Sequence, residues 1–219
     1  MNTIHKLPWK KLFPVILLAF LLIYPLAGAT PYMLHVFYTF FVWGVVAVFW
    51  NLLMGYAGIN SLGNIGFLAI GGYVSGILAN NFGITPWLTI LIGGLAACIL
   101  ATIFLGFPAL RLSGIYISLL TLIFADMLPS LLTQSRDITG GGMGLHEIPG
   151  FFPGMQKIHA YYICLIFYLL ILFITYRIIH SSTGMAFVAL RDSEKFAFCL
   201  GINKYRERIK VFAIASFLS

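Results

Sequence analysis

One carboxylate, Asp126, lies well inside an apolar run of this sequence. An acidic side chain within a membrane-spanning segment is costly and usually faces a cavity or a partner group, so Asp126 is a candidate contact for a transported solute. A second group of small and polar side chains lies in a glycine-rich stretch, where amide, hydroxyl and backbone groups could line a path for a polar solute. The members of this group are Asn51, Asn60, Ser61, Asn64 and Gly66.

The glycine-rich stretch has two compatible interpretations. Small residues allow helix backbones to approach closely, and Gly72 and Gly76 have the GxxxG spacing of tightly packed helix pairs. The stretch could also contain an interrupted helix, in which freed backbone groups and the amides of Asn60 and Asn64 line a path. The sequence leaves both interpretations open.

Motifs for enzymatic chemistry do not occur in this sequence. It has no HExxH, no paired CxxC and no P-loop pattern, so neither zinc catalysis nor ATP hydrolysis is encoded locally. The three cysteines, Cys98, Cys164 and Cys199, are scattered along the chain, which argues against a disulfide or a metal site. We therefore expect no catalytic residue, no metal site and no cofactor in this chain.

Long apolar runs must position the polar groups. The chain is 61% hydrophobic and 9% charged, whereas about 25% of residues are charged in an ordinary soluble domain. A helix needs about twenty apolar residues to cross a bilayer, and runs of this length recur here. The sequence predicts an all-α, polytopic transmembrane helical bundle with a truncated seventh span that begins near Val211. The six complete spans are predicted at 13–29, 36–54, 61–79, 86–107, 114–132 and 161–178.

The basic residues orient these spans. If the amino terminus is cytoplasmic, every Lys and Arg except Arg136 and Lys157 falls on the cytoplasmic side, as the positive-inside rule requires. The net charge of +7 is therefore explained by membrane topology, and no nucleic-acid partner is expected. The polar, cation-rich segment 177–210 then lies in the cytoplasm.

Within this segment, residues 182–203 are predicted to form short helices at the membrane surface. Asp192 or Ser193 can cap a helix start, Glu194 places negative charge in the first turn, and Gly201 can close the helix in a left-handed conformation.

The same helix has an apolar side. Phe196, Cys199 and Leu200 have helical spacing and are expected on one face. This face could rest on lipid, or it could dock into a groove of a soluble partner, and the residues alone do not decide between the two.

Three stretches resemble the permease subunits of branched-chain amino-acid ABC importers. SSTGMAFVALRDSEKFAFCLGIN, at 181–203, is similar to the cytoplasmic loop of that family, although Phe196 and Phe198 depart from its small or acidic residues. NLLMGYAGINSLGNIGF, at 51–67, and GFPALRLSGIYISLLTLIFADM, at 106–127, resemble two further family segments in the same order, with aspartate at 126 where glutamate is expected.

The resemblance implies a permease domain over 1–219 that includes a cytoplasmic coupling loop at 179–209. It implies a multi-pass protein of the bacterial inner membrane that imports leucine, isoleucine or valine. The implied partners are cytoplasmic ABC ATPase subunits that carry ATP and Mg²⁺, a second permease subunit and a periplasmic substrate-binding protein. The residues implied to couple to the ATPase are Gly184, Arg191, Asp192, Glu194, Ala197, Gly201, Ile202 and Asn203.

Other functions stay open at this level. Urea and short-amide permeases resemble the same pattern, so the substrate is not fixed. An ion-coupled secondary transporter would need ionisable groups near the midplane, for which Asp126 is the candidate. A membrane scaffold without a solute path is a third alternative. Because the family chain continues through further spans, we expect the chain ending at Ser219 to be a truncated form.

Overall fold

The computed structural model describes residues 9–28, 30–112, 114–146, 148–152 and 154–219. Across these residues the chain forms α-, 3-10 and π-helices joined by turns and coil, without a strand. The prediction of an all-α helical bundle is confirmed. Residues 1–8, which include the amino terminus that was predicted to be cytoplasmic, lie outside the described part of the chain.

Five helical segments in the described residues are long and apolar enough to cross a membrane. They are Pro31–Tyr56, Asn64–Phe82, Pro86–Arg111, Ile115–Gln134 and Lys157–Ile179. Each corresponds to a predicted span. The span predicted at 36–54 runs on to Tyr56, and the span predicted at 61–79 starts at Asn64.

The first predicted span, 13–29, has a different form. It is occupied by α1 (Trp9–Ile23) and the 3-10 turn η1 (Tyr24–Ala27), which provide a shorter apolar helix than the other five segments. Residue 29 lies outside the described residues. The end of α1 contacts the bundle, because the Tyr161 hydroxyl donates to the Leu21 carbonyl at 2.8 Å.

Helix boundaries follow local signals in the sequence. The side chain of Thr30 caps α2 (Pro31–Trp50) by accepting from the Met33 amide at 3.4 Å, and Pro31 occupies a first-turn position where no amide hydrogen is needed. The helix α3 (Asn64–Phe82) ends at Gly83, whose φ of +60° is a left-handed conformation that favours glycine.

Two π-helical turns modify these helices. The turn η2 (Asn51–Tyr56) extends α2, and η3 (Thr102–Gly106) joins α4 (Pro86–Ala101) to the short α5 (Phe107–Arg111). Pro108 accounts for η3, since its ring clashes with the carbonyl four residues earlier and it cannot donate a hydrogen bond.

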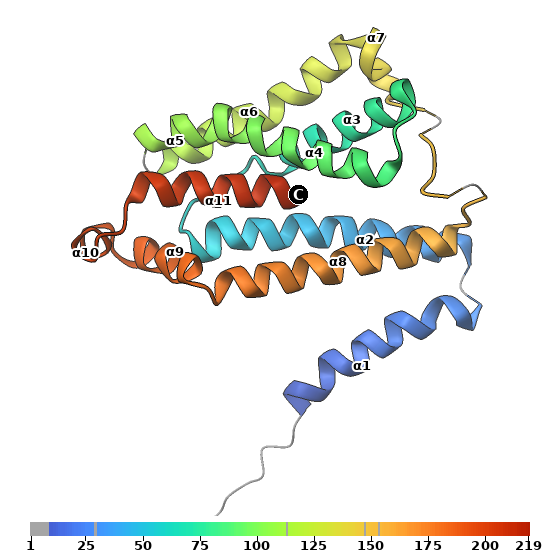
Figure 1. Cartoon of the computed structure of the whole chain (residues 1–219), viewed down its shortest axis with the longest axis horizontal. Coiled ribbons are helices and arrows are strands. Elements are labelled where there is room, and N and C mark those ends of the chain that lie inside the picture. The colour runs from blue at the N-terminus through green and yellow to red at the C-terminus, as the bar shows by residue number, and fades with distance from the viewer. Residues whose placement is uncertain (1–8, 29, 113, 147, 153) are drawn as a thin grey trace, which may run out of the picture.

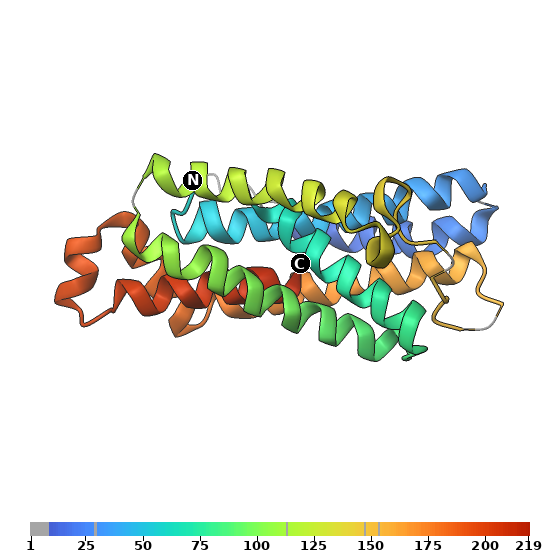
Figure 2. The same cartoon turned by 90° about the horizontal axis from the view of Figure 1, so that it is seen from above.

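The helices form two layers with one helix between them. The helices α2 and α8 (Lys157–Ile179) lie side by side in one layer, and α3, α4 and α6 (Ile115–Gln134) form the other (Figures 1 and 2). The last helix, α11 (Lys204–Leu218), packs between the layers against α4, with Val211, Phe212 and Ala215 fully buried. This helix begins before Val211, where the partial seventh span was predicted.

Close packing of small residues occurs in α3, but not where the GxxxG spacing placed it. A Cβ on Gly93 of α4 would lie 2.6 Å from the Gly71 carbonyl oxygen, so α3 and α4 approach as only glycine permits. Gly72 has no heavy atom within 4 Å of its hypothetical Cβ, which corrects the prediction for this residue. Gly76 is close to the side chain of Leu145 in a loop, not to a helix.

Candidate functional site

The chain is not helical between η2 and α3, at residues 57–63. We call this segment the break. Gly58 has a φ of +67°, and the Ile59 amide donates back to the Leu53 carbonyl at 2.9 Å. Ile59 and Ser61 are buried. The helix of the third predicted span is continuous from Asn64 to Phe82, so the irregular backbone lies between two membrane segments and not within one.

Hydroxyl groups of α6 satisfy the backbone of the break. The Thr121 hydroxyl oxygen accepts from the Leu62 amide at 2.9 Å, and the Ser118 hydroxyl donates to the Asn60 carbonyl at 2.8 Å. Irregular backbone within a membrane protein needs such partners, because hydrocarbon offers none. The break is thus a fixed structural element that is attached to α6.

The structure brings together only part of the predicted path. Ser61 is fully buried and Asn64 is 5% exposed, so these two lie together where α3 starts. Gly66 is buried nearby, and a Cβ there would lie 3.1 Å from Phe124. The other predicted residues, Asn51, Asn60 and Asp126, are exposed.

The position of Asp126 follows from the rotation of α6. Phe124 faces the core, and a residue two positions further along a helix points to nearly the opposite side. Asp126 therefore lies on the outer side of this chain, apart from Ser61 and Asn64.

The predicted coupling loop forms two short helices, α9 (Ser182–Asp192) and α10 (Glu194–Cys199), at one end of the molecule (Figure 1). Ser193 caps α10 by accepting from the Phe196 amide at 3.3 Å, and Gly201 closes it with a φ of +77°. Both predictions are confirmed, with Ser193 as the residue that makes the cap.

Apolar side chains project from α10. Phe196 is 63% exposed, Phe198 is 80% exposed and Leu200 is 61% exposed, whereas Ala197 is fully buried. Together with the exposed Cys199 they form an apolar surface that we call the docking tip. It is wider than the predicted face, because Phe198 belongs to it. A hollow of about 780 Å³ lies beside the tip, with Ile202 and Tyr205 in its wall.

Two cations fix the start of α10. Glu194 pairs with Lys204 at 2.5 Å and with Arg208 at 3.1 Å. Arg208 also donates to the carbonyls of Ala109 and Leu112, each at 3.1 Å. Burial lowers the pKa of Arg208, although the Glu194 carboxylate acts in the opposite direction. This network joins the docking tip to α11 and to the end of α5.

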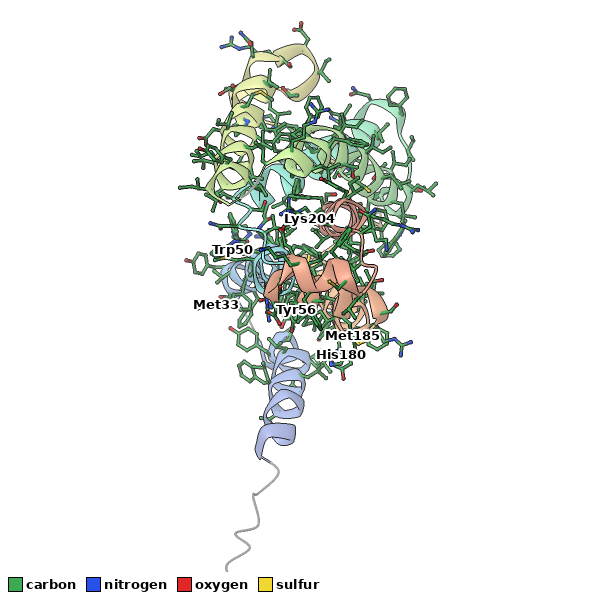
Figure 3. All side chains as sticks on the ribbon, turned by 90° about the vertical axis from the view of Figure 1, so that its left-hand side faces the viewer. Met33, Trp50, Tyr56, His180, Met185 and Lys204 are labelled. Carbon is green, nitrogen blue, oxygen red and sulfur yellow. The ribbon has the colours of Figure 1, made fainter. Side chains whose placement is uncertain are left out.

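Arg191 connects α9 to the break. Its Nη1 donates to the Gly55 carbonyl at 2.6 Å, and its Nε donates to Asp192 at 2.9 Å. Its side chain lies against Gly58, where a Cβ would come within 2.7 Å of the arginine Cγ. Figure 3 views this end of the molecule, with Tyr56 at the end of η2 and Lys204 at the start of α11 labelled. The loop and the break are therefore in direct contact.

Several predicted coupling residues build the loop itself. Gly184 is buried where α9 leaves α8, and a Cβ there would lie 2.2 Å from the Ile179 carbonyl oxygen. The Asn203 side chain caps α11 by accepting from the amides of Tyr205 and Arg206. Asp192 is exposed and pairs with Arg191 at 2.8 Å, and the partly buried Ile202 donates its amide to the Ala197 carbonyl at 3.0 Å.

Sequence reasoning missed Lys204 and Arg208. Their spacing of four residues places them on one face of a helix, which was the available signal for a shared acidic partner. In the described part of the chain, no cluster of three His, Cys, Asp or Glu residues that could hold a metal ion occurs.

Comparison with known proteins gives a consistent result. The family described as branched-chain amino acid transport system / permease component matches residues 32–219. The chain is 32% identical over 193 residues to the high-affinity branched-chain amino acid transport system permease protein LivM of Escherichia coli, covering 76% of this chain and 45% of that protein. The LivM protein of Salmonella typhimurium is 31% identical over 193 residues, with the same coverage.

A more distant relative is the probable branched-chain amino acid transport permease protein LivM of Methanocaldococcus jannaschii. It is 27% identical over 209 residues, which cover 78% of this chain and 60% of that protein. The chain thus spans about half the length of the curated relatives it matches. No solved structure matches the chain.

Proposed function

The chain belongs to the family of branched-chain amino acid transport permease components, and we propose that it forms part of the transmembrane path of an ATP-driven importer for leucine, isoleucine or valine. The relatives named above are permease proteins of branched-chain amino acid transport systems. The proposal extends that activity to this chain. Its membrane helices would form the path, and separate subunits would supply the energy.

The observation that carries the proposal is the contact of Arg191, in the same loop as the docking tip, with the break. An exposed cluster of large apolar side chains is typical of a surface that meets another protein. Here the cluster belongs to the same loop as Arg191, which donates to the Gly55 carbonyl beside the break. A partner that moves the tip would therefore act on irregular backbone next to Ser61 and Asn64.

The sequence has no P-loop, so the partner must bring the nucleotide. We assign the docking tip to cytoplasmic ABC ATPase subunits with bound ATP and Mg²⁺. The other proposed partners are a second permease subunit and a periplasmic binding protein that delivers the amino acid. On this proposal the docking tip and the amino terminus face the cytoplasm of a bacterial cell, which agrees with the distribution of Lys and Arg.

The loop would act as a lever between ATP and the path. Closure of the ATPase pair moves the docking tip, and Arg191 transmits the movement to the break. To shift the importer almost completely between outward-open and inward-open states, nucleotide must favour one state by about 5.5 kcal/mol.

Copurification tests this assignment. The full chain is coexpressed with the ATPase subunits and the second permease subunit, and the complex is isolated through a tag on this chain. Phe198→Asp places a charge on a side chain that is 80% exposed, so the fold is retained while the apolar contact is lost. We expect the ATPase subunits to be absent from the isolated complex.

The matched control is Met143→Asp, at a side chain that is 82% exposed in η4 (Gly141–Met143), at the other end of the molecule (Figure 1). This variant should copurify with the ATPase subunits as the wild type does. If both variants retain the ATPase subunits equally, the docking tip is not the ATPase contact.

A further inference from the structure

A hollow of about 280 Å³ lies between α2 and the start of α3. This volume is just below the range of about 300–1,000 Å³ that is usual for small-molecule sites, so only a small ligand would fit. Its polar side includes Ser61 and Asn64, and its apolar side includes Trp43, Val46 and Trp50. The hollow adjoins the break, to which Arg191 is attached.

The polar side is the amino-terminal end of a long helix. The 19-residue helix α3 begins at Asn64 without a side-chain cap. The first amide hydrogens of a helix lack partners within the helix, and together they carry about half a positive charge. Such an end binds carboxylate groups.

Asn64 supplies a second and independent feature. It lines the hollow, it is 5% exposed, and its Oδ1 is buried without a hydrogen-bond partner. A buried acceptor left without a donor costs about 1–3 kcal/mol. Because Oδ1 is shielded from the hollow in this structure, the amide must rotate toward the hollow before a ligand N–H group can bind it and remove this cost.

The opposite wall is apolar and aromatic. Trp43 and Trp50 are seven residues apart on α2, and Val46 lies between them at helical spacing, so the three share one face. Trp43 is 52% exposed and Trp50 is 46% exposed, which leaves indole surface free for contact with a ligand. The residues lining the hollow include no Asp, Glu, Lys or Arg.

We propose that this hollow is a transit site for a zwitterionic α-amino acid with an apolar side chain. The carboxylate lies at the start of α3, the ammonium group donates to Asn64 Oδ1, and the apolar side chain lies against Trp43 and Trp50. One ligand satisfies all three features, because an α-amino acid carries its carboxylate and its ammonium group on the same carbon. The assignment rests on the proposed import function and adds the position and orientation of the substrate.

The absence of charged lining residues gives the site a selectivity. A zwitterion brings no net charge into the hollow. An amino acid with a charged side chain would place an unpaired charge against the indoles, which costs several kcal/mol. The site therefore favours apolar amino acids over lysine or glutamate.

Protection of a single thiol from labelling tests the site directly. The three native cysteines are replaced by serine, and Ala47→Cys introduces a thiol on α2 in the wall of the hollow. The assembled importer in nanodiscs is treated with a maleimide, with and without leucine. We expect leucine to slow labelling, whereas isocaproate, without the ammonium group, and isoamylamine, without the carboxylate, do not. Leu95→Cys, at an exposed residue of α4 outside the hollow, is the control and should be unaffected by leucine.

Transport by hollow variants provides the second measurement. Asn64→Leu removes the buried acceptor, and Trp50→Leu removes an indole. Each should lower leucine uptake by about tenfold, the equivalent of one lost interaction of about 1.4 kcal/mol, while ATP hydrolysis is retained. Trp87→Leu is the matched control, since Trp87 is 45% exposed but lies outside the hollow. It should transport leucine as the wild type does.

The outcomes separate the two proposals. If the wild-type importer shows no ATP-driven leucine uptake, the proposed function fails. If the wild type transports leucine but leucine does not slow labelling at Ala47→Cys, or both hollow variants transport normally, the transit site alone is refuted. Slower labelling caused by added phospholipid and not by leucine would identify the hollow as a lipid site and would also refute it.

Discussion

Replacement of Arg191 by alanine should separate ATP hydrolysis from transport. The substitution removes the 2.6 Å hydrogen bond to the Gly55 carbonyl and the packing of the arginine side chain against Gly58. The docking tip stays in place, because Ser193, Lys204 and Arg208 hold α10 independently of Arg191. The loop would still bind the ATPase but would move without the break.

The magnitude follows from the contact. A hydrogen bond from a charged group contributes about 1.5–3 kcal/mol. The Arg191 side chain is 40% exposed, so solvent screening reduces this contribution to about 1 kcal/mol. A loss of about 1 kcal/mol changes the population of the linked state about fivefold.

The assay measures leucine transported per ATP hydrolysed by the assembled importer in proteoliposomes. Arg191→Ala should lower this ratio about fivefold, with ATP hydrolysis close to the wild-type rate. Arg191→Lys keeps the charge but loses the planar fork that reaches the carbonyl, so it should give an intermediate ratio. Arg206→Ala, at another exposed arginine of the same end of the molecule, is the control and should leave the ratio unchanged.

Two results would refute this reasoning. An unchanged ratio in Arg191→Ala would show that the contact with Gly55 transmits nothing. An equal fall in hydrolysis and uptake would show that Arg191 supports docking or folding instead of coupling.

Three further predictions concern stability, measured by thermal unfolding of the purified chain. Gly184→Ala should destabilise the protein by about 1–3 kcal/mol through overpacking, because its Cβ would meet the Ile179 backbone at 2.2 Å, whereas Gly72→Ala should change little because its Cβ would meet nothing within 4 Å. Equal unfolding temperatures for the two variants would contradict this. Thr121→Val should lower the stability by about 1–3 kcal/mol, because it leaves the Leu62 amide unpartnered. Thr121→Ser keeps the hydroxyl and should retain most of that stability. An unchanged unfolding temperature in Thr121→Val would show that the break does not need this hydrogen bond. Arg208→Met should destabilise more than Glu194→Gln, because it also frees two carbonyls, while Glu194 has a half-exposed side chain whose pairs are weak. The opposite order would show that the ion pairs of Glu194 contribute more to stability than the carbonyl bonds of Arg208.

Local signals in the sequence were sufficient for the helices and their caps. The apolar runs predicted the five long helices, because a bilayer requires that length and composition. Ser193 and Gly201 predicted the ends of α10, because capping and left-handed turns depend on residues close in sequence.

Tertiary contacts account for what the sequence did not predict. Arg191 meets Gly55, which is 136 positions away, and no local pattern indicates that pair. The outward position of Asp126 depends on the rotation of α6, which is set by the burial of Phe124 on the other side of the helix. The width of the docking tip follows from Ala197, which packs inward as the small residue of α10 and leaves Phe198 outside.

Uptake of radiolabelled leucine into proteoliposomes tests the central claim most directly. The vesicles contain the full chain with its ATPase subunits, the second permease subunit and the binding protein, and ATP is supplied on the side of the docking tip. We predict accumulation that requires ATP hydrolysis and continues when ionophores dissipate all ion gradients. Accumulation without ATP that collapses with the ionophores would contradict the claim and would indicate an ion-coupled transporter.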